Sequence, residues 1–199
     1  MSQQDIPTRE VARRVFAGEF NTATYTFTES DAERAPVYAL LPTGAPANRV
    51  YFVGTLTETE DVGSDNEYWR GRVVDPTGTF FVYAGQYQPA AAAKLRELEP
   101  PAYIAVVGKP RTYTTDDGSV TVSVRPETIS VVDAATRDAW VLETARQTID
   151  RMQGEDPELE SYREMVSEAY PDPEEDIPAM VVTALESVDG AVTDELPLA

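Results

Sequence analysis

The sequence contains no cysteine and no histidine among its 199 residues. This absence excludes disulfide bonds, thiol nucleophiles, Cys/His zinc sites, Ser-His-Asp triads and imidazole acid–base chemistry. No hydrophobic run approaches the ~20 residues that a membrane-spanning helix needs. The first ten residues lack the basic and apolar regions of a secretory signal. We therefore expect no membrane association, and we expect the protein in the cytoplasm.

Lysine is also scarce, because Lys94 and Lys109 are the only two lysines beside 14 arginines. The chain carries 35 acidic and 16 basic residues, which gives a formal net charge of −19. Much of the excess lies in residues 155–199, which hold 14 acidic residues and 1 basic residue. Carboxylates keep a surface hydrated, and 1 M salt screens charge repulsion within ~3 Å. The composition therefore indicates adaptation to multimolar salt, and the alternative is an ordinary acidic protein with an acidic tail. If the protein is adapted to high salt, its net charge says little about the ligand.

Residues 49–133 have the pattern of a small β-barrel. Alternating hydrophobic residues predict five strands, over 50–57, 68–74, 79–84, 102–109 and 120–125. A helix is predicted over 89–98, and Asp75–Gly78 predicts a tight hairpin turn. Gly54 lies inside the first strand and predicts a bulge or a sharp bend. Three strands, a helix and two strands are the element order of the five-stranded OB fold, whose helix joins strands three and four.

An extension is predicted before the barrel. Residues 5–18 have the spacing of a short amphipathic helix, which Thr8 can cap. The residues expected to form its hydrophobic stripe are Val11, Val15 and Phe16. Two alternating segments, 24–28 and 37–41, predict strands, and the prolines and glycine of 42–46 predict a loop.

A helical region is predicted after the barrel. Residues 134–152 predict one long helix capped by Asp133. Weaker helical patterns cover 159–170 and 177–188, and residues 189–199 are expected to form an irregular tail. We therefore predict a mainly β protein, a five-stranded OB-fold barrel with an N-terminal helix/strand extension and a C-terminal helical region. The predicted segments are the extension (1–48), the OB-fold domain (49–133), an assembly helix (134–154) and an acidic helical region with a tail (155–199).

An OB fold binds nucleic acid across its second and third strands and the flanking loops. Bases need aromatic rings on which to stack, and phosphates need cations. If the turn at Gly78 sets the register, Phe81 and Tyr83 face outward beside Arg70 and Arg72, whereas a one-residue slip would bury these aromatic rings. The arginines have an alternative role in solvated pairs with acids on neighbouring strands. The candidate nucleic-acid-binding residues are Arg70, Arg72, Phe81, Tyr83, Tyr87, Lys109, Arg111 and Tyr113.

The helix predicted over 134–152 has a narrow hydrophobic seam with a heptad-type spacing, which is typical of a helix–helix contact. Packing of this helix on its own barrel or on the later helices is the alternative. The candidate partner-binding residues are Trp140, Leu142, Ala145, Ile149 and Met152. Trp140 faces either the barrel or a partner.

Catalysis is not predicted. The carboxylates at 116–117 and 172–176 lie in a hairpin turn and a proline-containing linker. Catalytic carboxylates need rigid, partly buried positions, which neither segment offers. There is no glycine-rich phosphate loop, and the remaining nucleophiles are unactivated Ser, Thr or Lys. We therefore expect that the chain is not an enzyme and requires neither a metal nor another cofactor.

Several segments of the barrel resemble replication protein A-type OB folds in order and spacing. The matching segments are Val50–Leu56 (first strand), Val74–Thr79 (the D-x-T-G hairpin), Tyr103–Tyr113 (fourth strand) and Val124–Pro126 (end of the fifth strand). The motifs cover residues 49–152, and the whole chain is most similar to the replication protein A-associated proteins of haloarchaea. The family often ends its third strand with Trp, and this chain has Tyr87 just beyond that place.

This resemblance implies a subunit of a replication protein A-like complex that binds and protects single-stranded DNA in replication and repair. It also implies a larger partner subunit, which the helix over 134–152 would contact. The alternative is an OB-fold assembly subunit that holds a DNA-binding partner without itself contacting DNA.

Overall fold

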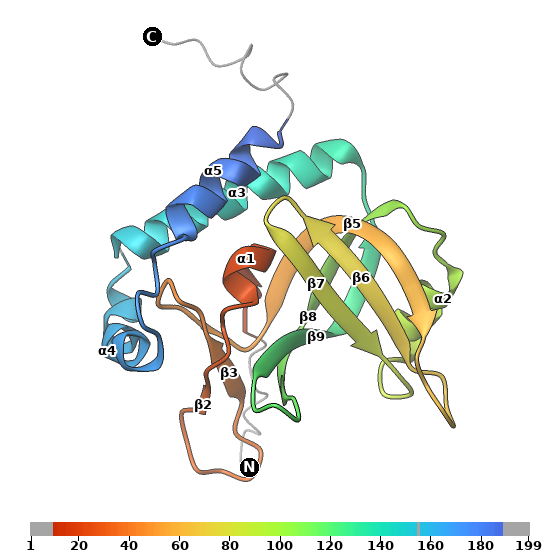
Figure 1. Ribbon diagram of the computed structural model, residues 1–199, viewed down its shortest axis with the longest axis horizontal. Coiled ribbons are helices and arrows are strands. Elements are labelled where there is room, and N and C mark those ends of the chain that lie inside the picture. The colour runs from red at the N-terminus through yellow and green to blue at the C-terminus, as the bar shows by residue number, and fades with distance from the viewer. Residues whose placement is uncertain (1–9, 155, 189–199) are drawn as a thin grey trace, which may run out of the picture.

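The computed structural model describes residues 10–154 and 156–188. A β-barrel forms one side of the molecule, a small sheet lies beside it, and two helices cross one end (Figure 1). The strands are β1 (Arg13–Arg14), β2 (Thr26–Thr28), β3 (Val37–Leu40), β4 (Pro46–Ala47), β5 (Val50–Asp61), β6 (Trp69–Asp75), β7 (Gly78–Ala84), β8 (Ala102–Thr114) and β9 (Val120–Val131). The helices are α1 (Ala17–Phe20), α2 (Pro89–Glu97), α3 (Ala134–Gln153), the 3-10 helix η1 (Pro157–Leu159), α4 (Glu160–Ala169) and α5 (Ile177–Glu186).

The barrel contains strands β5–β6–β7–β9–β8 in that order, and pairing of β8 with β5 closes it. Residues 50–56 of β5 pair with β8, and residues 55–61 pair with β6. Helix α2 lies between β7 and β8 in the chain, as the OB fold requires. The predicted fold class, a mainly β protein built on a five-stranded OB-fold barrel, is confirmed.

Strand β5 changes partners near Gly54. A Cβ atom on Gly54 would lie 2.7 Å from the backbone oxygen of Val74, so only glycine allows β6 to approach this closely. The register shift between β5 and β6 lies further on, between Leu56 and Glu58. The expected bulge is therefore displaced from Gly54, whose own role is close packing of two backbones.

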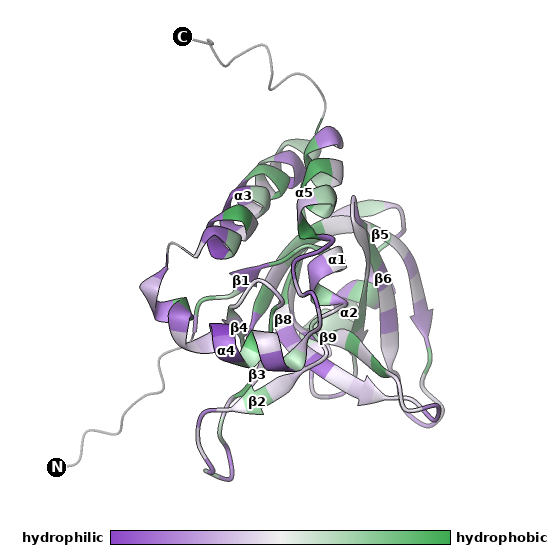
Figure 2. Cartoon of the chain, turned by 60° about the vertical axis from the view of Figure 1, so that its left-hand side comes forward, coloured by the Kyte–Doolittle hydropathy of each residue, from purple (hydrophilic) through white to green (hydrophobic). Residues whose placement is uncertain are grey.

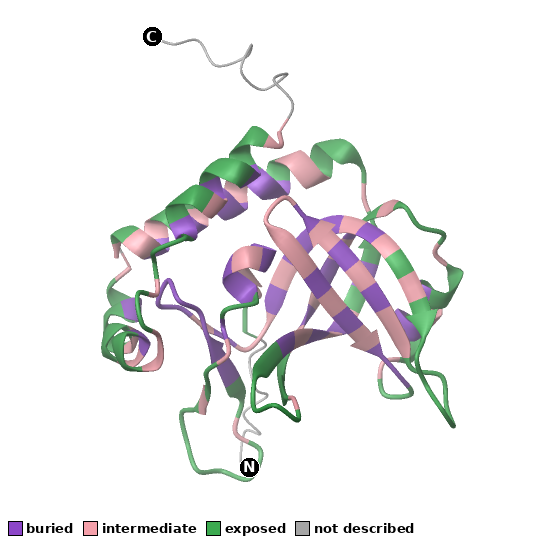
Figure 3. Cartoon of the chain, in the orientation of Figure 1, coloured by how far each residue is buried: buried purple, intermediate pink, exposed green. Residues whose placement is uncertain are grey.

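Buried and partly buried residues alternate along β6 and β7 (Figure 3). Phe80 and Val82 are fully buried, whereas Phe81 and Tyr83 are only partly buried. Phe80 stacks on Phe52 of β5, with ring centroids 3.8 Å apart. The register predicted from the hairpin turn is confirmed.

The helix predicted over residues 5–18 is wrong in the part that the structure describes. There the chain forms β1, which pairs parallel with β5, and only then the short helix α1. The N–H of Arg13 donates to the carbonyl of Arg49 at 2.8 Å, and Val11 of the expected hydrophobic stripe is 89% exposed. The backbone pairing of β1 with β5 therefore determines the structure of this segment, and the local helical spacing does not. The expected cap, Thr8, lies outside the described residues.

Helix α1 is capped by a turn 58 residues away in sequence. Asp75 accepts a hydrogen bond from the N–H of Ala17 at 2.7 Å, and the hydroxyl of Thr77 accepts one from the N–H of Gly18 at 2.9 Å. The same carboxylate accepts bonds from the N–H groups of Thr77 and Gly78 within its own turn. Burial raises the pKa of Asp75, although these hydrogen bonds act in the opposite direction. The β6–β7 turn therefore closes its hairpin and also holds the extension.

The C-terminal helices largely follow the prediction. The Asp133 side chain caps α3, and Gly154 ends it in the left-handed conformation with φ of 67°. The helices expected over 159–170 and 177–188 correspond to α4 and α5, and α5 packs along α3 (Figure 2). The expected tail over 189–199 lies outside the described residues.

A buried ion pair joins α3 to the extension. Arg151 donates to Glu19 of α1 and to Thr43 of the β3–β4 turn, each at 2.8 Å. The Arg151 side chain is 6% exposed and the Glu19 side chain is fully buried. The hydrophobic core around them is continuous from the extension through the barrel to α5. Three segments far apart in sequence therefore meet at one charged contact.

Replacing Arg151 with Ala should lower the free energy of unfolding by about 3–5 kcal/mol, because the buried carboxylate of Glu19 keeps its hydrogen bond from Thr43 but loses its opposite charge. Denaturant unfolding followed by circular dichroism measures this decrease. Arg146→Ala is the matched control, since Arg146 pairs with Glu143 and Asp150 on the surface of the same helix and should matter little. Equal decreases in the free energy of unfolding of the two variants would show that the buried ion pair does not stabilise the contact between α3 and the extension.

Candidate nucleic-acid interface

Arginine and aromatic side chains from β6 and β7 lie together on the outside of the barrel. In the antiparallel register Arg72 lies opposite Phe81, and Arg70 lies opposite Tyr83. The guanidinium of Arg70 lies 5.9 Å from the centroid of the Phe81 ring, which is a cation–π contact. These four side chains form the barrel face. The structure thus brings together the four residues predicted on these two strands.

Tyr68 extends the barrel face from the loop before β6. Its ring stacks on that of Tyr83 with a centroid distance of 5.7 Å and an interplanar angle of 22°. Tyr68 is 44% exposed, so part of the residue faces solvent beside Tyr83. The sequence pattern does not predict this residue as part of the site, because only the fold shows that the loop returns beside the end of β7. The available signal was its position at the start of the strand predicted over 68–74, where it alternates with Arg70 and Arg72.

Two further predicted tyrosines lie at the edges of this surface. Tyr113 is 65% exposed near the tip of the β8–β9 hairpin, and Tyr87 is 83% exposed just after β7. Neither ring takes part in the hydrophobic core. Exposed aromatic rings next to a basic surface offer the flat contact on which an unpaired base stacks.

Strands β8 and β9 contribute cations beside the aromatic side chains. Lys109 and Arg111 alternate along β8, and Lys109 lies directly opposite Arg125 of β9. Burial and the nearby charge of Arg111 lower the pKa of Arg125. Arg125 belongs to the fifth-strand motif but is not among the residues predicted for the site. Its alternation with buried Val122 and Val124 was the signal that it faces outward.

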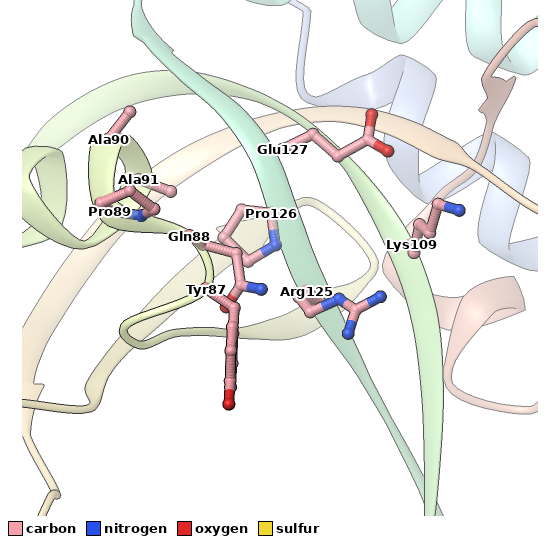
Figure 4. A pocket seen from close by; sticks show the side chains of 9 residues that line it. All are labelled: Tyr87, Gln88, Pro89, Ala90, Ala91, Lys109, Arg125, Pro126 and Glu127. Atoms are coloured by element: carbon pink, nitrogen blue, oxygen red, sulfur yellow. The ribbon is translucent and has the colours of Figure 1, made fainter. Parts of the chain in front are cut away.

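Arg125 and Lys109 line a pocket of about 530 Å³ beside the first turn of α2. Figure 4 shows Tyr87, Arg125 and Lys109 following one another across this pocket, which we call the α2 pocket. Tyr87 contributes an aromatic ring on one side of the pocket, and Arg125 and Lys109 contribute two cations on the other side. The arrangement matches the two chemical groups of a nucleotide, a base and a phosphate.

Most cations of this surface are not neutralised by the protein. Within residues 10–154 and 156–188, Arg72, Lys109, Arg111 and Arg125 form no ion pair, in a chain with 35 acidic residues. Arg70 differs, because it pairs with Glu60 on β5 at 2.6 Å, which is the alternative role considered for the arginines. Cations without carboxylate partners attract anionic ligands.

The structure separates the predicted partner-binding residues into two groups. Trp140 and Ala145 are each 2% exposed inside the core, so Trp140 takes the inward-facing alternative. Met152 is partly buried against the same core. Leu142 and Ile149 are each 37% exposed, and they lie seven residues apart on the outer side of α3. Only these two present a substantial apolar surface to a partner.

The carboxylates at 116–117 and 172–176 are the acidic clusters of the sequence that could be compared with a metal site. Among the described residues, no group of three or more acidic side chains could hold a metal ion. Asp117 accepts hydrogen bonds from Thr115 and Ser119 of its own turn, and these bonds lower its pKa to about 2.

None of the helices in the described residues, 10–154 and 156–188, has the length and hydrophobicity that a bilayer span requires.

No protein-family model matches the chain, and no curated protein matches it either. Similar solved structures include the second single-stranded DNA-binding protein of Mycobacterium smegmatis, with 18% identity over 45% of this chain and 89% of that chain (TM-score 0.37). They also include the S. cerevisiae mitochondrial single-stranded DNA-binding protein Rim1, with 18% identity over 43% and 94% of the two chains (TM-score 0.34). OBody NL8, solved bound to hen egg-white lysozyme, has 18% identity over 43% and 93% (TM-score 0.37). Similarities of this size give no information on function.

Neighbouring phenylalanines on β7 offer a direct test of the two faces of this strand. Phe80→Ala should lower the free energy of unfolding by about 3–5 kcal/mol, because it removes a fully buried ring that stacks on Phe52. Phe81→Ala should lower the free energy of unfolding much less, because the Phe81 ring lies on the barrel face. Denaturant unfolding of both variants measures the difference, and similar effects of the two substitutions would contradict the assigned register.

Proposed function

We propose that the chain binds single-stranded DNA across the barrel face and the adjoining surface of β8 and β9. The observation that supports this proposal is the grouping of exposed aromatic rings with cations that have no carboxylate partner within the described residues. Stacking contributes about 1–3 kcal/mol per base, and the cations would hold the phosphates between stacked bases. A single strand, unlike a duplex, presents unstacked bases to such rings.

The expected binding has little sequence preference. Every base has a π-face, so stacking on Tyr83, Phe81 or Tyr113 does not select one base. Arginine and lysine side chains that contact phosphates carry no sequence information either. The proposed role is therefore coverage of single-stranded DNA by a binding protein, and not catalysis on it.

We also propose that this chain acts as a subunit of a replication protein A-like complex that protects single-stranded DNA in replication and repair. The barrel motifs at 49–152 support this context through their resemblance to that family. The acidic, lysine-poor composition supports a haloarchaeal source and a cytoplasm with concentrated salt. A larger DNA-binding subunit is the partner proposed for α3.

Assembly is a second candidate function, and the exposure of α3 favours it. Leu142 and Ile149 lie one heptad apart and are each 37% exposed, so α3 retains an apolar edge although α5 and the barrel cover its other side. An assembly subunit would use this edge to hold a DNA-binding partner. The two functions are compatible, since the edge and the barrel face belong to different elements.

Replacing both Tyr83 and Tyr113 with Ala should weaken binding of oligo(dT), by about 1–3 kcal/mol for each ring that stacks a base. Fluorescence anisotropy with the full chain measures the dissociation constant. Tyr103→Ala is the matched control, because Tyr103 is 38% exposed near the opposite end of β8. An unchanged dissociation constant in the folded double variant would contradict binding by stacking.

The double variant Leu142→Ala/Ile149→Ala should remain folded, because both side chains are partly exposed, but it should no longer co-purify with a larger single-stranded DNA-binding subunit. Circular dichroism checks the fold, and co-purification from the source cells measures the partner contact. Val182→Ala on α5 is the control, because Val182 is 53% exposed. Retention of the partner by the folded double variant would place the contact elsewhere.

A further inference from the structure

A second hollow continues from the α2 pocket toward the N-terminal extension. It has a volume of about 580 Å³ and lies between the β8–β9 hairpin and the segment that contains Arg34 and Arg49. Lys109, Arg125 and Glu127 line both hollows, so the two adjoin along β8 and β9. We call the second hollow the extension groove.

The extension groove is basic although the protein is strongly acidic. Its lining includes five cations and only two carboxylates, whereas the whole chain has a net charge of −19. One of the carboxylates, Glu127, is paired with Arg49. Arg34 and Arg111 are exposed and form no ion pair within the described part of the chain. A hollow with this excess of cations is suited to a polyanion.

The cations also follow a continuous line. Arg125 and Lys109 stand opposite each other on β9 and β8, and Arg111 is the next outward residue along β8. Arg34 lies across the extension groove from these strands. The exposed ring of Tyr87 stands at the other end of the line, on the far side of the α2 pocket. A chain with regularly spaced phosphates fits such a line better than an isolated anion does.

We infer that the extension groove is a track for the phosphate backbone of single-stranded DNA that leaves the barrel face, with Arg34 as its outermost phosphate contact. This inference rests on the proposed function and adds to it a second binding surface, which the N-terminal extension supplies. The exposed apolar wall at Val37, which is 54% exposed, gives sugars and bases a non-polar surface beside the cations. The protein should therefore cover a longer stretch of DNA than the barrel face alone.

The test measures anisotropy of oligo(dT) probes of about 4 to 16 nucleotides with the wild-type full chain and with Arg34→Ala. Removal of the Arg34 side chain should leave the affinity for the shortest bound probe unchanged and weaken binding of the longest probe about two- to fivefold, as expected for one exposed ionic interaction. For the long probe alone, the slope of log K against log salt should also become shallower by about 0.7 for each phosphate that the variant no longer neutralises. Arg34 is exposed, so folding of the variant is not at risk.

Arg146→Ala is the charge-matched control, because it removes one positive charge from the outer side of α3. Equal weakening in the two variants, weakening that does not depend on probe length, or no weakening at all would overturn the extension groove as a DNA track. If the wild-type chain binds short probes and its affinity does not increase for longer ones, this inference is overturned and the proposed function is not. Absence of binding at every length would overturn the proposed function and this inference with it.

Discussion

The two-sided pairing of β5 is the constraint on which the rest of the structure depends. This strand pairs with β8 over residues 50–56 and with β6 over residues 55–61, so one strand supplies both edges that close the barrel. Gly54 allows the close approach of β6 at the change of partner. Pairing with β5 sets the register of β6, and the tight β6–β7 turn sets that of β7. A slip of one residue would exchange their inner and outer side chains. The barrel face therefore follows from the closure of the sheet.

The extension depends on the barrel through two polar contacts. Asp75 caps α1 from the β6–β7 turn, and Arg151 of α3 reaches the buried carboxylate of Glu19. A buried carboxylate is unfavourable without hydrogen bonds or an opposite charge, so each contact specifies one arrangement of the segments that it joins. Both contacts fix parts of the N-terminal extension, and other residues of the same extension line the extension groove. A free N-terminal segment could not provide such a wall.

Local patterns predicted the barrel elements well, because alternation and the Asp75–Gly78 turn are short-range signals. They failed over residues 5–18, where the backbone of Arg13 pairs with Arg49, 36 positions along the chain. Helical spacing predicts the hydrophobic seam of α3, but it does not show which side of the helix α5 covers. Trp140 and Leu142 are therefore both predicted as partner-binding residues, although only Leu142 is exposed. Tyr68 and Arg125 are absent from the predicted site because a strand pattern gives the face on which a residue lies. It does not give the neighbours of that residue on other strands.

The proposed binding of DNA by a chain with a net charge of −19 requires that its acidic residues lie away from the proposed DNA-binding surface. The acidic excess is concentrated in residues 155–199, beyond the barrel in sequence, whereas cations without ion pairs within the described residues gather on β6, β8 and β9. At 1 M salt the screening length is ~3 Å, so distant carboxylates hardly repel a DNA strand and distant cations hardly attract one. Only direct contacts then contribute, and aromatic stacking keeps its strength where electrostatic attraction is screened. A surface that places cations next to aromatic rings is suited to such conditions, because the stacked base holds the phosphate within contact distance of the cation.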